Sequence, residues 1–219
     1  MTRRIRRRLL VFAVLIAVGV ASASWWSSRR TPQWFAPPPP SESRGERAWQ
    51  VERRFAEEFS KVRADKPLWG LRIRESDLNV WLADRLRPWV EHRGRWPEQL
   101  GDVQVHLTPD TVVLGVELLD LDTVAFLEGV PVDAEDGSIS LRWTAAGIGR
   151  LRIPWPEARV RSAILGRFGD GELAEFGALL DGVSVPGAIP LPDGRVVSVL
   201  GGEIGDGEAV LELVTAPGE

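Results

Sequence analysis

The sequence predicts an α+β protein made of an N-terminal transmembrane helix followed by a mostly antiparallel curved sheet packed against two to three helices. Three observations support this. The chain opens with a basic stretch and a long apolar run, two later segments repeat apolar residues at helical spacing, and most of the remainder is short apolar or alternating runs separated by turn residues.

The N-terminus has the features of a membrane anchor. Residues 1–8 contain five arginines and no acid, and residues 9–26 are apolar or small. Eighteen helical residues span about 27 Å, enough to cross the bilayer core. The basic side is expected to stay in the cytoplasm, and Trp25 and Trp26 lie where an interfacial aromatic belt would be. We expect a single-pass inner-membrane protein that contacts the lipid bilayer through residues 9–26 and has a periplasmic, extracytoplasmic body.

A cleaved signal peptide is the alternative interpretation. The same stretch has a basic start, a short apolar region and the small residues Ala21-Ser22-Ala23, which resemble a cleavage site. Both interpretations export the body of the chain. Whether residues 1–23 are removed stays open from the sequence.

Residues 27–44 are expected to be a proline-rich linker, and residues 45–219 a single extracytoplasmic domain. Four consecutive prolines, Pro37 to Pro40, form a stiff polyproline spacer of about 12 Å. This spacer is expected to hold the domain just off the membrane. Trp34 and Phe35 within the linker could contact either lipid headgroups or the domain itself.

Helical periodicity predicts a helix over residues 45–64 and a second over residues 77–90, with Ser76 as its N-cap. On the second helix Trp81 and Trp89 share an apolar face, so at least one of them should be core. Asn79 lies on the same face and is expected to bond to neighbouring backbone. Pro88 should distort or end the last turn. Two further helical pieces are expected within residues 156–168 and 173–180.

The remaining apolar runs are expected to be strands. Residues 103–107 alternate cleanly, and Thr108-Pro109-Asp110 is a turn before the next run. The expected strands cover residues 68–73, 103–107, 111–118, 124–132, 138–143, 147–153, 195–200 and 209–215.

Composition excludes some classes of function. Residues 1–30 carry seven arginines and no acid, whereas residues 31–219 carry a net charge of −11. Such an acidic body does not suit phosphate neutralisation, so we expect no nucleic-acid partner. The chain has no cysteine, which excludes disulfides and thiolate chemistry.

No catalytic, metal or cofactor motif is recognisable, and we expect no enzyme activity, no metal and no cofactor. His92 and His106 are expected to be exposed. Asp120 and Asp122 are expected to lie on one strand face about 6.6 Å apart, a geometry that does not exclude a glycosidase pair but more often marks a solvated edge. Glycine-rich acidic stretches are interpreted as turns: 133–137, 169–172 and 205–208.

Residues 68–154 resemble the YpmS-like proteins, which are membrane-anchored extracytoplasmic proteins of largely unknown function. The resemblance rests on Gly70-Leu-Arg-Ile-Arg-Glu-Ser-Asp-Leu-Asn79, on Trp81-Leu-Ala83, on Asp136-Gly137 and on Gly149-Arg-Leu-Arg-Ile-Pro154. Envelope proteins of the planctomycete type also share a late Leu-Pro-Asp-Gly-Arg, here Leu191 to Arg195. The resemblance implies a helix lying in a curved sheet, an arrangement that shelters lipid tails in some related architectures.

Two functions follow as expectations. The first is a non-catalytic structural or protein-interaction domain of the cell envelope. The second is a lipid- or amphiphile-binding module at the membrane surface, for which a continuous apolar cavity between helix and sheet would be the discriminating feature.

Overall fold

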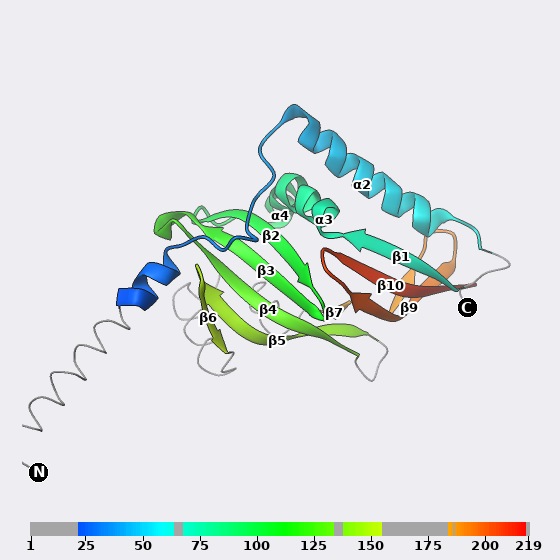
Figure 1. The fold of residues 1–219 in the computed structure, drawn as a ribbon. Helices are drawn as coiled ribbons and strands as arrows, with labels where there is room; N and C mark the ends of the chain where they lie inside the picture. The colour runs from blue at the N-terminus through cyan, green and yellow to red at the C-terminus, as the bar shows by residue number, and fades with distance from the viewer. Residues whose placement is uncertain (1–21, 64–67, 134–137, 155–183, 186, 218–219) are drawn as a thin grey trace, which may run out of the picture.

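The computed structural model describes residues 22–63, 68–133, 138–154, 184–185 and 187–217 (Figure 1). This part of the chain is α+β, as expected, but it forms two antiparallel sheets instead of one, together with the helices α2, α3 and α4. The helical pieces expected within 156–168 and 173–180 lie outside the described residues.

The first sheet, sheet A, has the strand order β1-β10-β9-β8. A cluster of buried side chains lies on it, formed by Leu71, Val197, Val199 and Leu213. Helix α2 lies across this sheet, and its Phe55 and Phe59 pack against the cluster (Figure 1). The strands are β1 (Leu68–Arg74), β8 (Ala188–Pro190), β9 (Arg195–Ile204) and β10 (Glu208–Pro217).

Helix α2 (Glu42–Ser60) begins and ends slightly earlier than expected. The turn between β8 and β9 reaches its C-terminal end: the Arg195 guanidinium donates to the carbonyl oxygens of Ser60 at 3.1 Å and Lys61 at 2.7 Å. Asp193 accepts from the same guanidinium at 2.7 Å, and Gly194 between them has φ +85°. The late Leu-Pro-Asp-Gly-Arg stretch is therefore a turn that satisfies orphan carbonyls of a helix end.

The second sheet, sheet B, has the order β2-β3-β4-β5-β6, with the short β7 paired to β5. The β2–β3 hairpin turns at Thr108-Pro109-Asp110 as expected. The strands are β2 (Leu100–Thr108), β3 (Thr111–Leu118), β4 (Thr123–Asp133), β5 (Ile139–Ile148), β6 (Leu151–Pro154) and β7 (Ser184–Val185).

Helix α3 (Glu75–Trp81), a π-helical turn η1 (Leu82–Leu86) and helix α4 (Arg87–Arg93) follow one another directly. The expected distortion near Pro88 is confirmed, because the backbone widens into the π turn just before the residue that lacks an N–H. The expected N-cap is wrong. Arg74 is the N-cap, and Ser76 lies exposed inside the first turn.

The tryptophan prediction for this helix is also wrong. Val80 is the buried residue of α3, Trp81 is half-buried with its indole N–H donating to Glu52 at 3.0 Å, and Trp89 is 49% exposed. For Trp89 the reason is the π turn, because the wider turn changes the phase of every later residue and a face counted at 100° per residue does not continue through it. Trp81 precedes that turn, and its indole faces Glu52 of α2.

Two side chains of α3 cover the free edge of β2. Asn79 accepts from the Val105 N–H at 2.7 Å and donates to the Val105 carbonyl at 2.8 Å. The Glu75 carboxylate accepts from the Leu107 N–H at 2.7 Å. The expectation that Asn79 bonds backbone is confirmed, and these bonds close an edge that would otherwise be open to pairing.

The two sheets meet at their turns. The N–H of Gly207, in the β9–β10 turn, donates to the Leu107 carbonyl of β2, and the Asp110 N–H donates to the Ile204 carbonyl, both at 3.0 Å. Residues 205–208 are thus a turn, as expected, and this turn joins sheet A to sheet B.

Candidate functional site

One face of sheet B carries an aligned set of side chains. Strand alternation places Gln104, His106 and Thr108 of β2 on this face. The register then aligns a row across the sheet in which each residue is opposite the next: Gln104, Gly115, Phe126, Gly147 and Arg152.

Two glycines in this row make room for aromatic rings. A Cβ added at Gly115 would lie 2.4 Å from the Trp34 ring, and one added at Gly147 would lie 2.2 Å from the Phe126 ring. The two rings meet edge to face with centroids 6.1 Å apart, a favourable aromatic geometry. The glycines therefore admit Trp34 and Phe126 onto the face of the sheet.

Trp34 belongs to an N-terminal strap, defined here as residues 27–36, which lies against sheet B (Figure 1). The strap is bonded at both ends. Near its start, the Arg150 N–H donates to the Ser27 carbonyl at 2.9 Å, and the Thr123 hydroxyl donates to the Ser28 carbonyl at 2.6 Å. Near its end, the Ala36 N–H donates to the side-chain oxygen of buried Gln104 at 2.9 Å.

Gly149, in the β5–β6 turn, lies in close contact with the strap. It has φ +57°, and a Cβ at this position would lie 2.2 Å from the Ser28 carbonyl oxygen. Both the backbone conformation and the contact require glycine here. The strap is therefore built into the domain rather than resting loosely on it.

The proline run is a bridge inside the molecule. Pro37 to Pro40 connect Ala36, which is bonded to β2, with α2, which begins at Glu42 (Figure 1). The contact of Trp34 and Phe35 with the domain, one of the two interpretations left open, is observed, and Phe35 is buried. The expected role of the prolines as a spacer below the domain is not what the structure shows.

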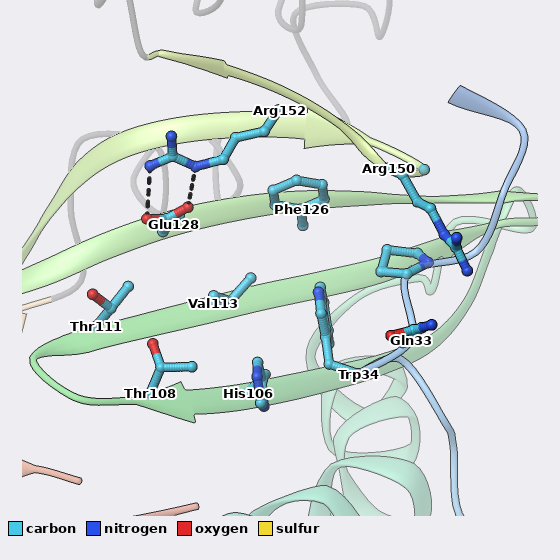
Figure 2. A pocket seen from close by; sticks show the side chains of 12 residues that line it. Gln33, Trp34, His106, Thr108, Thr111, Val113, Phe126, Glu128, Arg150 and Arg152 are labelled. Carbon is cyan, nitrogen blue, oxygen red and sulfur yellow. Dashed lines mark hydrogen bonds and ion pairs between the residues drawn. The ribbon is translucent and has the colours of Figure 1, made fainter. Parts of the chain in front are cut away.

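A groove of about 500 Å³ opens beside the strap on this face (Figure 2). Trp34, His106 and Phe126 provide aromatic surface. The polar residues Thr108 and Thr111 lie at the end away from the strap, and Glu128 of β4 and Arg152 of β6 lie along one side (Figure 2). Its lining is formed by Pro32, Gln33, Trp34, His106, Thr108, Thr111, Val113, Phe126, Glu128, Gly149, Arg150 and Arg152.

The charges of the groove are two arginines and one glutamate. Arg152 forms a two-point ion pair with Glu128, at 2.6 and 2.8 Å. The hydrogen bonds to Glu128 raise the pKa of the Arg152 guanidinium. Arg150 donates from Nε to the Thr31 carbonyl at 3.3 Å, and among the described residues its two Nη groups have no partner. Arg150 is thus the cation of the groove that is free to bind a ligand.

His106 is not the exposed surface residue that we expected. Its ring lies parallel to Trp34 at 5.6 Å between centroids, and its Nδ1 is 3.1 Å from a Glu75 carboxylate oxygen. The pair joins the groove to the start of α3. His92, by contrast, is exposed on α4, as expected.

The other candidate residues do not form a site. Asp120 and Asp122 are exposed and lie at a 3-10 turn (η2, Leu119–Leu121) between β3 and β4, with Asp122 in the left-handed region at φ 48°. The expectation of two acids on one strand face is therefore wrong, because the strand ends at Leu118. Most of the acidic stretch at 133–137, and all of 169–172, lies outside the described residues.

Within the described ranges, no group of three or more possible metal ligands comes together. In the same ranges no helix has both the length and the apolar character needed to cross a bilayer. Most of the expected span at 9–26 lies in residues 1–21, which are not described.

The groove could not be predicted from the sequence, because the residues that line it are far apart in the chain. Gly115 and Gly147, each inside an apolar strand, were the available signal, since a glycine within a strand often marks close approach of another group.

No protein-family model matches this chain, and neither the curated proteins nor the solved structures contain a match. The resemblance to YpmS-like proteins stays a prediction.

Proposed function

We propose that the chain is a single-pass, membrane-anchored domain on the extracytoplasmic side of the inner membrane, with a binding or structural role in the cell envelope. The observation that carries this proposal is the docking of the strap. The predicted span ends at Trp26, and the next residue, Ser27, already accepts a hydrogen bond from Arg150 of sheet B. No free linker separates the predicted span from the domain.

The surface next to the predicted span suits a bilayer interface. Trp25 and Trp26 are 64% and 63% exposed, and the guanidinium groups of Arg29 and Arg30 lie 4.6 and 4.5 Å from the centroids of their rings. Exposed tryptophans flanked by arginines are typical of the headgroup region. This pattern supports an orientation in which the strap end of sheet B lies at the membrane surface.

The described side chains favour binding over catalysis. The two lining groups best suited to acid–base chemistry are engaged in structural contacts: Glu128 with Arg152, and His106 with Glu75. Among the described residues lining the groove there is no serine, cysteine or lysine nucleophile beside a base. A role in binding a protein or a small partner is the function that this arrangement supports best.

The second candidate, a lipid- or amphiphile-binding module, is favoured by the groove. The groove lies on the face of sheet B beside the strap, however, and not between helix and sheet, where an apolar cavity was the expected signature. Its lining mixes aromatic surface with threonines, arginines and a glutamate. Such a surface suits the polar part of an amphiphile better than its tail.

Topology is tested by cysteine labelling, because the chain has no cysteine of its own. Ser43→Cys, at an exposed position of α2, should react in intact spheroplasts with a maleimide that does not cross membranes. Thr2→Cys, in the predicted cytoplasmic tail, should react only after the membrane is opened. The opposite pattern would refute the proposed topology. Intact-mass measurement separates the anchor from a cleaved signal peptide.

A further inference from the structure

We infer that the strap end of the groove binds the phosphate-bearing headgroup of an anionic phospholipid, with Arg150 as the principal contact. This inference rests on the proposed membrane location and names the ligand of the groove. It depends on three features: the position of Arg150, the local charge, and the shape and lining of the groove.

The position follows from the strap. The Arg150 N–H is bonded to the Ser27 carbonyl, one residue beyond the expected interfacial Trp26. The Arg150 guanidinium is held by its bond to the Thr31 carbonyl, and its remaining donors lie at the edge of the groove (Figure 2). Lipid phosphates of the leaflet into which the span emerges would lie at the same depth.

The local charge is opposite in sign to that of the whole body. Residues 31–219 carry a net charge of −11. The described lining of the groove nevertheless has two arginines and a single glutamate, and the exposed Arg29 and Arg30 precede the lining residue Pro32 by only three and two positions in the strap. Because Glu128 already neutralises Arg152, the uncompensated charge of the groove is on Arg150. A guanidinium with free donors is well suited to bind phosphate oxygens.

The lining fits a headgroup rather than an acyl chain. The groove is open to solvent, and Thr108 and Thr111 line its end away from the strap, where their hydroxyls can bond to a polyol (Figure 2). An acyl chain in such a groove would leave much of its apolar surface in water. The tails of the bound lipid therefore stay in the bilayer, and only its headgroup enters the groove.

Native mass spectrometry of the full chain, released from detergent with added lipid, provides the test. The unaltered chain should retain phosphatidylglycerol at least fivefold better than phosphatidylcholine. Arg150→Gln should lower the retention of phosphatidylglycerol about tenfold, the loss expected for one charge-assisted hydrogen bond. Arg150→Lys should recover most of it. Arg87→Gln, at an exposed arginine of α4, is the matched control and should bind like the unaltered chain.

Three results would overturn the inference: equal retention of both lipids by the unaltered chain, equal retention by the Arg150→Gln variant, or complete competition by soluble glycerol phosphate at the lipid concentration. The last result would identify a free phosphate compound as the ligand. The comparison of the two lipids requires no substitution, so it holds even if a variant misfolds. The cysteine-labelling pattern tests the location independently, so a failure of the lipid inference is distinguishable from a failure of the proposed topology.

Discussion

Gly115 allows the strap to dock on sheet B, because the Trp34 ring occupies the space that a side chain at position 115 would fill. Around this contact the strap, His106 and Phe126 come together on the face of sheet B. A methyl group at position 115 would overlap the indole of Trp34. The docking of the strap therefore requires a residue without a side chain at this position.

Gly115→Ala is therefore expected to lower the free energy of unfolding by about 1–3 kcal/mol, the usual cost of forcing extra volume into a filled site. It should also make the strap more sensitive to protease. Gly201→Ala is the matched control, since Gly201 is also in a strand but a Cβ there meets nothing within 4 Å. Denaturant unfolding of both variants checks this, and an equal, small effect at the two positions would contradict the docking.

A second residue-scale prediction concerns acid stability. The hydrogen bond from Arg195 holds the pKa of the Asp193 carboxyl below its ordinary value of 3.8. A lowered folded pKa contributes stability that is present above pH 3.8 and is lost as the pH falls through the lowered value. Asp193 is exposed, so the contribution is small. Thermal unfolding between pH 5 and 2 should be less pH-dependent in Asp193→Asn; an unchanged profile would show that the pair contributes nothing.

At the scale of elements, the β2 edge is closed by side chains rather than by another strand. Asn79→Ala removes both bonds to Val105 and leaves a partly buried N–H and C=O without partners. The expected loss is about 1–3 kcal/mol. Ser76→Ala, one turn earlier and exposed, should change stability by less than about 0.5 kcal/mol. If Ser76→Ala were the more damaging change, Ser76 would act as the N-cap after all.

Strand periodicity predicted the β2–β3 hairpin and the strands β4 and β5 that pair after it, because alternation is a local property of the sequence. The prediction is wrong at the next hairpin: β5 continues past the expected end at residue 143 to Ile148, and the expected strand 147–153 runs across the turn that separates β5 from β6. The division into two sheets was not predictable in the same way. Strand β1 pairs with β10, and the partner of Leu71 is Leu211, far along the chain. The phase of the helix after Trp81 was lost for a different reason, since a π turn leaves no clear sequence signal apart from the nearby Pro88.

The candidate groove is formed by residues that are far apart in the sequence. Trp34 lies in what looked like a linker, Gly115 and Gly147 lie inside strands, and Arg150 lies in a turn. Each was visible as a residue, but no local pattern connects them. Only the tertiary structure brings the strap onto the sheet and makes His106 part of a stacked pair instead of an exposed side chain.

For the molecule as a whole, the docked strap implies a fixed orientation. The β3–β4 turn, with the exposed Leu119 and Leu121, lies at the strap end of sheet B, because Thr123 just after it is bonded to Ser28. The C-terminal end of β10 lies at the opposite side of the domain (Figure 1). A domain on a free linker would tumble and present both ends to the bilayer equally.

Spin labels on the full chain in nanodiscs that contain a nickel-chelating lipid measure this orientation. Asp120→Cys labels the strap end, and Ala216→Cys labels the exposed opposite end. We expect strong relaxation enhancement at position 120 and little at position 216, and Gly149→Val should remove the difference by displacing the strap. Equal enhancement at the two positions in the otherwise unaltered chain would contradict the account.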